Sequence, residues 1–524
     1  MDVAYDRVIV ARPDIFESGG DGIFQDLTKN GGKNLVVITQ ESLGRLKLVS
    51  NDSLGARATL GFLEHQVTVS SHPGSSHKKG GKLGQSKFSA DLRYSIINEN
   101  VDLVLVKGHH DKDIPGLIRK LGEHYETTGG SSPVVMTNDR ADSISLKFDG
   151  VIVEKPGFLT VSSEIVNEWA VVGNDELLAR LRQSESPLPL EQVVEILGGN
   201  LRLNQFVKFI SKDPEYARVE GDLRWDRERT EIRDVDNLRL RLLGDREKSR
   251  KIRLGNHVSQ DLLGVTPKDM GQYLALQYGL LNPDISTFFL CGSHGSGKTL
   301  LAYAAAIEQI LWYGKPDRQK RGLDPEGKGG IYDRIVLLKP NQTLGGKKRE
   351  VGALPGTLFD KLRDHLSCYI DAHRETALYQ KMPFEDLLRH PTRGNHIFDE
   401  PRITKEIIYG GSKAHFPPHT EIMEMTYSGV MFGRSFRNTL ILIDEAQNFE
   451  PYELKVIIER LGLGCKVVVM GDPWQANGEH VSTEINGLTS GMAHYLDTHF
   501  TASLTLGRNY RSQASKHAKT WRTF

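Results

Sequence analysis

The eight residues 292–299, Gly-Ser-His-Gly-Ser-Gly-Lys-Thr, constrain the fold more than any other stretch of the chain. They fit the pattern G-x-x-x-x-G-K-[ST], follow the apolar run STFFLCG and precede the apolar stretch TLLAYAAAIEQIL. A glycine-rich turn between a strand and a helix lets successive backbone N–H groups face phosphate oxygens, while the lysine reaches the β and γ phosphates. The pattern therefore predicts an α/β domain that binds a nucleoside triphosphate through Gly292, Gly295, Ser296, Gly297, Lys298, Thr299 and Leu300.

A second apolar run, ILIDE at 441–445, ends in two carboxylates. Downstream of a phosphate loop, a strand-end aspartate holds Mg²⁺, which the loop threonine also binds, and the next glutamate can polarise the attacking water. We therefore expect Asp444 and Thr299 at Mg²⁺ and Glu445 as the catalytic base. The alternative is a pair of solvated acids at a strand end.

Two later segments narrow the class of nucleotide hydrolase. VVVMGDPWQA places Gln475 three residues after Asp472, and LGRNYRS places Arg511 near the C-terminus. Both are similar to segments of superfamily 1 helicases, whose glutamine senses the γ-phosphate and whose arginine acts as a finger on the transferring group. A forked, permanently charged guanidinium suits that role. Taken alone, each could be an ordinary loop glutamine or a surface arginine.

The rest of the chain predicts two further parts. Residues 1–172 alternate short, continuously apolar runs (7–11, 34–38, 101–106, 133–137 and 150–154) with helical stretches such as 53–66 and 113–125. Such runs suit parallel strands buried on both faces. Residues 173–255 combine a helical stretch with antiparallel β segments. Residues 256–524 return to α/β, with an irregular excursion over 366–420. We expect three domains with these boundaries.

Composition excludes several classes of protein. The chain has 524 residues, with 67 basic and 67 acidic side chains, so any nucleic acid must be bound through local patches. Three distant cysteines form no disulfide framework, which favours a reducing, cytoplasmic location. No apolar run approaches 18 residues, and the N-terminus lacks a signal pattern, so no membrane partner is expected.

Three polar segments have more than one interpretation. The basic excess between Asp222 and Arg253 is typical of a salt-bridged surface, but would also suit a nucleic-acid-facing module. The Gly-, Ser- and Lys-rich segment 70–87 predicts a flexible loop, which could contact RNA phosphates. Residues 109–113 (HHDKD) carry metal-ligand types without a spacing that fixes a geometry, so a polar turn is the better interpretation.

The C-terminal half resembles PhoH proteins. PKDMGQYLAL (267–276) is similar to the family's P-x-x-x-x-Q-x-x-A-L, GALPGTLFDKL (352–362) to its G-x-L-P-G-x-x-x-x-K, and ILIDEAQN (441–448) to its L-D-E-A-Q-N. The resemblance is colinear over about 256–515. It implies a RecA-like ATPase in which Gln272 recognises adenine, and it implies a ring, plausibly a hexamer. Lys339 stands where the family usually has arginine, and His294-Gly295-Ser296 replaces Ala-Gly-Thr.

The N-terminal half resembles the PIN domain of two-domain PIN–PhoH proteins. VVMTNDRADSISLKFDG (134–150) is similar to the family's V-T-N-D-x-x-L-R-x-K-A-x-x-x-G. PIN nucleases gather carboxylates around Mg²⁺ or Mn²⁺, which activates water for RNA cleavage. The resemblance implies Asp111 and Asp139 as ligands, with Asp14 and Glu41 as offset candidates, because Arg12 and Ser42 occupy the usual acidic positions. An intact metal site and a degenerate one both remain open.

These patterns favour an ATP-dependent helicase or translocase, acting on RNA or another single-stranded nucleic acid, coupled to a PIN-type endoribonuclease. A second hypothesis is an RNA remodeller whose PIN domain is a non-catalytic scaffold. A third is a P-loop NTPase without a nucleic-acid substrate, against which the GDPWQ and NYRS segments argue.

Overall fold

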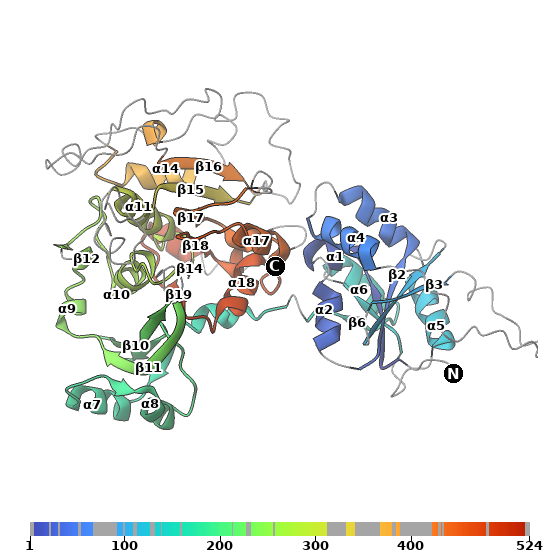
Figure 1. Ribbon diagram of the computed structural model, residues 1–524, viewed down its shortest axis with the longest axis horizontal. Coiled ribbons are helices and arrows are strands. Elements are labelled where there is room, and N and C mark those ends of the chain that lie inside the picture. Colours follow the sequence, from blue (N-terminus) through green and yellow to red (C-terminus); the bar gives the residue numbers. More distant parts are fainter. Residues whose placement is uncertain are drawn as a thin grey trace, which may run out of the picture. The chain divides into compact units, whose positions relative to one another are not determined.

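A computed structural model describes the chain in segments: 5–19, 22–29, 32–50, 54–66, 92–97, 100–107, 113–125, 132–137, 139–157, 160–211, 213–226, 232–254, 257–311, 332–340, 367–379, 384–387, 422–427, 431, 434–477 and 481–518. The chain forms two compact units (Figure 1). The first holds residues 1–161 with 450–453 and 478–485, and the second holds the remainder. The three-domain division at 172/173 and 255/256 stays a prediction.

The first unit is built on a six-stranded sheet in the order β3-β4-β2-β1-β5-β6. Strands β1 (Arg7–Ala11), β2 (Asn34–Thr39), β4 (Val101–Val106), β5 (Val134–Met136) and β6 (Val153–Glu154) pair in parallel, and β3 (Leu92–Ile96) runs antiparallel at the edge. Alternate residues of these strands enter two different cores. One core packs on α5 (Ile114–His124) and α6 (Arg140–Phe148). The other packs on α1 (Pro13–Gly19), α2 (Gly22–Lys29), α3 (Gln40–Val49) and α4 (Leu54–Gln66).

The second unit begins with a small mixed sheet in the order β7-β9-β10-β11-β8. Its centre is the antiparallel pair β10 (Glu215–Trp225) and β11 (Ile232–Leu242), flanked by β7 (Ala170–Gly173), β9 (Phe206–Phe209) and β8 (Leu188–Pro189). Helices α7 (Asp175–Gln183) and α8 (Leu190–Leu197) contribute to its apolar core. The charged residues of the pair bond across strands, as in Arg239–Asp222 and Arg241–Glu220, which favours the salt-bridged interpretation of this region.

The larger sheet of the second unit has six parallel strands in the order β16-β15-β17-β18-β14-β19. Their bounds are β14 (Thr287–Gly292), β15 (Arg334–Lys339), β16 (Met423–Tyr427), β17 (Thr439–Ile443), β18 (Lys466–Gly471) and β19 (Thr501–Leu506). Helices α10 (Met270–Leu274), α11 (Lys298–Leu311), α14 (Ser367–Arg374), α17 (Pro451–Ile458) and α18 (Gly487–Tyr495) surround this sheet (Figure 1). Because β14, β17, β18 and β19 all end at one edge, their following loops meet there.

The α/β fold class predicted from the sequence is confirmed, and the apolar runs form the expected parallel strands. The sequence interpretation missed β3 and β16, which lie at sheet edges and lack a continuous apolar run. Segment 70–87 and most of 366–420 lie outside the described residues. No helix in the described part of the chain is long and apolar enough to cross a membrane.

Candidate functional site

The phosphate loop connects β14 to α11, as its spacing predicted. Gly295 and Gly297 have φ angles of 74° and 94°, which side-chain-bearing residues rarely adopt. A Cβ on Gly295 would lie 2.6 Å from Asn509 Oδ1 and from Arg511 Cγ, and one on Gly297 would lie 2.9 Å from Gln272 Nε2. The glycines therefore give the loop its curvature and also admit two other predicted site segments.

Lys298 and Thr299 hold the phosphate loop from inside. The Lys298 Nζ donates to the carbonyl oxygens of Gly292 at 2.5 Å and Ser293 at 3.3 Å, so the amine lies within the curve that phosphates would enter. The Thr299 hydroxyl donates to Asp444 Oδ2 at 3.0 Å. A hydroxyl beside a buried carboxylate presents the hard oxygen ligands that Mg²⁺ prefers, so the donor set fits this ion.

Glu445 follows Asp444 and has a left-handed backbone, with φ 55° and ψ 38°. Its carboxylate accepts a hydrogen bond from Gln447 Nε2 at 2.6 Å, and its N–H donates to Asp444 Oδ1 at 3.0 Å. A non-glycine residue in this conformation costs about 1–3 kcal/mol and is characteristic of functional sites. The backbone and Gln447 together orient the carboxylate predicted to activate water.

Gln475 belongs to the same hydrogen-bond network. Its Nε2 donates to Asp472 Oδ2 at 2.8 Å, and the Asp472 N–H donates to Gln447 Oε1 at 3.1 Å. Gln447 is fully buried, and its amide oxygen and nitrogen bind the Asp472 N–H and the Glu445 carboxylate, respectively. The sequence interpretation quoted the DEAQN segment but assigned Gln447 no role; its place two residues after Glu445 was the available signal.

Lys339 ends β15 next to the two acids. Leu338 pairs with Ile443 in the parallel register of β15 and β17, and the Asp444 N–H donates to the Leu338 carbonyl oxygen at 3.0 Å. Burial by itself would lower the pKa of Lys339, but Cys368, Asp444 and Glu445 around it raise the pKa of that amine overall. Lys339 therefore places a positive charge beside the two acids.

Gln272, predicted to recognise adenine, lies against the phosphate loop. It is buried, its Nε2 donates to the Ser296 carbonyl oxygen at 2.8 Å, and its Oε1 accepts from the Lys268 N–H at 2.7 Å. Asp269 caps α10 by accepting from the Gln272 N–H at 2.8 Å. The α10 N-terminus and the loop are thus fixed to each other.

The NYRS segment contacts the phosphate loop of the same chain. The Tyr510 N–H donates to the Gly295 carbonyl oxygen at 2.9 Å, and the Tyr510 hydroxyl donates to Asp269. Burial, followed by the Asp269 carboxylate, raises the pKa of Tyr510 to about 12. With Asn509 and Arg511 over Gly295, the predicted arginine finger lies beside the loop on which it would act.

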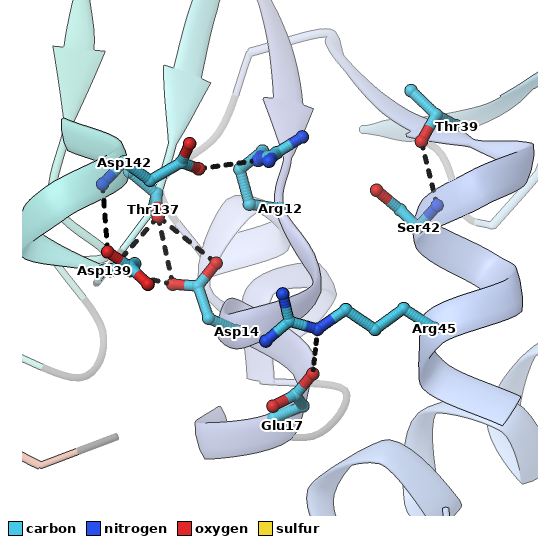
Figure 2. Close-up of polar contacts among 9 residues, drawn as sticks. All are labelled: Arg12, Asp14, Glu17, Thr39, Ser42, Arg45, Thr137, Asp139 and Asp142. Carbon is cyan, nitrogen blue, oxygen red and sulfur yellow. Dashed lines mark hydrogen bonds and ion pairs between the residues drawn. The ribbon is translucent and has the colours of Figure 1, made fainter. Parts of the chain in front are cut away.

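The N-terminal candidates Asp14 and Asp139 do come together (Figure 2). Asp14 is buried on α1, and the Thr137 hydroxyl donates to both of its carboxylate oxygens at 3.1 and 3.2 Å. The Asp139 N–H lies 3.2 Å from Asp14 Oδ2, whereas its carboxylate caps α6 through the Asp142 N–H. Arg12, at the usual acidic position, binds Asp142 at 2.8 Å beside this pair (Figure 2).

The other N-terminal candidates have different positions. Asp111 lies outside the described residues, as does most of the HHDKD segment. Glu41 lies in the first turn of α3, next to Ser42, whose N–H is capped by Thr39. Glu17, one helical turn after Asp14, is buried and pairs with Arg45 at 3.3 Å (Figure 2).

Sequence reasoning missed Glu17, although its i+3 spacing from Asp14 in a helix was a usable signal. Among the residues that the structure describes, no three His, Cys, Asp or Glu side chains form a metal-binding group. In the described part of the N-terminal site, Asp14 therefore accepts from the Asp139 N–H, while Arg12 and Arg45 pair with two further acids, Asp142 and Glu17.

Comparisons with known proteins match part of the chain. Residues 326–519 fit the family model of PhoH-like proteins. Protein PhoH2 of Bacillus subtilis (strain 168) is 28% identical over 253 residues, covering 48% of this chain and 46% of that protein. Protein PhoH2 of Thermobispora bispora is 25% identical over 253 residues, which cover 48% of this chain and 46% of that protein. A PhoH-like protein of Synechocystis is 29% identical over 189 residues, 36% of this chain and 42% of its own. The chain thus spans about half the length of the curated relatives that it matches.

Proposed function

Because the C-terminal part of this chain contains a PhoH-like P-loop ATPase domain related to the PhoH2 proteins, we propose that ATP hydrolysis drives the protein along single-stranded nucleic acid, with RNA as the substrate. The observation that carries the proposal is the linkage of four separate segments around one loop. Gln272, Asp444 and residues 509–511 contact the phosphate loop directly, and Gln447 connects residues 472–475 to Glu445. Residues 472–475 and 509–511 resemble helicase segments, which a small-molecule NTPase does not need.

The hydrolysis step follows from the positions of these side chains. Lys298 and the loop N–H groups bind the β and γ phosphates, and Gln272 binds the adenine. Thr299 and Asp444 would hold Mg²⁺, which neutralises charge on the phosphate oxygens. Glu445 accepts the proton of the attacking water, and Arg511 stabilises the charge that grows in the transition state. Gln475 senses the γ-phosphate through its link to Asp472.

For the N-terminal unit we propose a metal-dependent ribonuclease site around Asp14 and Asp139, with Asp111 and Glu41 as further candidates and Mg²⁺ or Mn²⁺ as the ion. The convergence of Asp14 and Asp139 supports it. One observation favours the alternative of a non-catalytic scaffold: the Arg12 guanidinium, rather than a carboxylate, ends the first strand and already pairs with Asp142.

One assay tests the proposed activities separately. A labelled duplex RNA with a single-stranded tail is incubated with and without ATP, in Mg²⁺ or in Mn²⁺. Glu445→Gln is expected to abolish unwinding and to leave cleavage intact, whereas Asp14→Asn is expected to abolish cleavage and to leave unwinding intact. Cleavage that persists in Asp14→Asn protein would come from a contaminant or another site. Absence of ATP-dependent unwinding, together with an ATPase rate unaffected by polynucleotides, would overturn the translocase proposal.

A homo-oligomeric ring also stays a proposal, taken from the resemblance to PhoH proteins. The contact of Tyr510 and Arg511 with the loop of their own chain is compatible with a finger that acts within one subunit. Light scattering with and without ATP measures the assembly. A strictly monomeric, fully active enzyme would rule the ring out.

A further inference from the structure

Trp474 stands out from its surroundings in the ATPase domain. It belongs to the short 3-10 turn η7 (Pro473–Gln475) directly after β18, where Gly471, Asp472 and Pro473 are all buried. The Trp474 side chain is nevertheless 56% exposed. An exposed indole on a rigid, otherwise buried turn loses little conformational entropy when it binds a partner.

The backbone under Trp474 is fixed by Asp472. One carboxylate oxygen, Asp472 Oδ1, accepts from the Trp474 N–H at 3.2 Å, and the other, Oδ2, accepts from Gln475 Nε2 at 2.8 Å. Residues 472–475, called here the relay segment, are therefore joined to one another through the Asp472 carboxylate.

The relay segment is joined directly to the catalytic carboxylate. Gln447 bridges them, with its Oε1 accepting from the Asp472 N–H at 3.1 Å and its Nε2 donating to Glu445 Oε2 at 2.6 Å. A second link runs from the Asn477 N–H to Asn448 Oδ1 at 2.9 Å. Gly471 leaves the space for the bridge, because a Cβ there would lie 2.3 Å from Gln447 Oε1.

We propose that Trp474 is a stacking site for one base of a bound single-stranded nucleic acid, and that Gln447 is the positioning residue through which this contact controls Glu445. The proposal rests on the nucleic-acid function proposed above and specifies how the strand and the hydrolysis step communicate. Every base has an aromatic face, so a lone exposed indole suits sequence-independent binding of a moving strand. Glu445, in its strained left-handed conformation, is the group most sensitive to a small shift of Gln447.

The binding half is tested by titrating fluorescein-labelled oligo(U), and oligo(dT) in parallel, into three proteins. Trp474→Ala is expected to weaken binding about tenfold or more, the usual loss for one stacked base. Trp474→Phe keeps an aromatic face and is expected to bind close to the parent level while losing part of the tryptophan fluorescence quenching. Tyr379→Ala is the matched control, because Tyr379 is a similarly exposed aromatic residue, 48% exposed, outside the relay segment.

The coupling half is tested with Gln447→Leu, which keeps the side-chain volume and removes both hydrogen bonds. The ATPase rate is measured with and without saturating poly(U). We expect a lower kcat, a nearly unchanged KM for ATP, and loss of the stimulation by poly(U) although poly(U) still binds. A merely structural role would instead raise KM or lower both rates by the same factor.

The outcomes separate this inference from the proposed function. If the parent protein neither binds oligonucleotides nor responds to poly(U), the nucleic-acid function fails and this inference fails with it. If the parent responds and Trp474→Ala binds and responds equally well, only the inference is overturned. It is also overturned if Trp474→Ala changes the oligomeric state while oligo(U) affinity stays the same, because the indole would then contact a second copy of the chain.

Discussion

At the scale of single residues, we expect a change at Glu445 to separate nucleotide binding from hydrolysis. Its carboxylate is oriented by Gln447 and by a left-handed backbone, whereas the phosphate loop makes its contacts through Lys298 and Thr299. Glu445→Gln removes the proton acceptor and keeps the shape, so ATP binding should persist while hydrolysis slows by about 10²–10⁴-fold. Fluorescent ATP-analogue binding and phosphate release measure the two effects. A rate near that of the parent would show that another group activates water.

Arg511 should affect turnover far more than affinity. Its Cγ and Cδ lie beside Gly295 of the phosphate loop, and the proposed role of its guanidinium is to meet charge that develops only in the transition state. Arg511→Ala should therefore lower kcat by about 10³-fold or more, with a much smaller change in ATP affinity. Arg119→Ala, at an exposed arginine of α5 in the first unit, is the control for loss of a surface arginine. Equal losses in kcat and affinity would contradict a finger role.

The residues of the ATPase site that sequence could predict are those whose motif spacing is itself the chemical requirement. A phosphate loop needs its glycines and lysine at fixed offsets, and the expected residues meet in the structure. Gln447 and Glu17 were missed because each acts through a neighbour on another element, and such a partnership exists only after folding. Asp14 and Asp139 lie 125 positions apart, and only the parallel pairing of β1 with β5 makes them neighbours.

At the scale of elements, the contact between the end of β18 and the DEAQN turn requires a glycine at position 471, because a side chain there would meet Gln447. Gly471→Ala places a Cβ where Gln447 Oε1 now lies, so Gln447 must move and release Glu445. We expect slower ATP hydrolysis with little loss of ATP binding. Gly199→Ala, where a Cβ meets open space, is the control and should behave as the parent. Parental activity in Gly471→Ala would mean that Gln447 is dispensable.

A second element-scale prediction concerns Glu215, which joins β10 to α7 and to α9 (Asp245–Lys248) through Arg182 and Lys248. The hydrogen bond from Arg182, helped by Lys248, lowers the pKa of Glu215 below its ordinary 4.5. A lowered folded-state pKa means that the stability from these contacts is complete above about pH 4.5 and is lost as pH falls through the folded value. Glu215→Gln should therefore lower Tm at pH 7 and make little difference near pH 3.

Elements with a continuous apolar run were predictable, because a strand buried on both faces of a parallel sheet must be apolar throughout. The five runs of the first unit and the strands around the phosphate loop were predicted on that basis. The edge strands β3 and β16 could not be predicted in this way. In β16, with the sequence MEMTY, a charged residue interrupts the apolar run. The strand lies at the edge of its sheet and pairs with one strand, β15, so its residues need not be apolar throughout.

At the scale of the whole molecule, all three cysteines should be unreactive in the folded protein. Burial raises the pKa of Cys291 to about 12, and burial likewise raises the pKa values of Cys368, next to Asp444, and of Cys465. Thiols react as thiolates, so titration with Ellman's reagent at pH 8 should find none reacting quickly, and three after unfolding in denaturant. A fast thiol in the native protein, lost in Cys368→Ser, would show that the region next to Asp444 opens to solvent.

Because Glu445 has a left-handed backbone, selection for stability and selection for activity should favour different residues at this position. Most residues with a Cβ are strained in this conformation, whereas glycine, which has no Cβ, and asparagine adopt the same φ with less strain. A library of variants at this position, sorted only for resistance to heat or protease, should therefore enrich residues that cannot accept a proton. Sorted for growth or turnover, it should return glutamate. The proposed role of Glu445 and the stability of the folded chain thus make opposite demands on the residue at position 445.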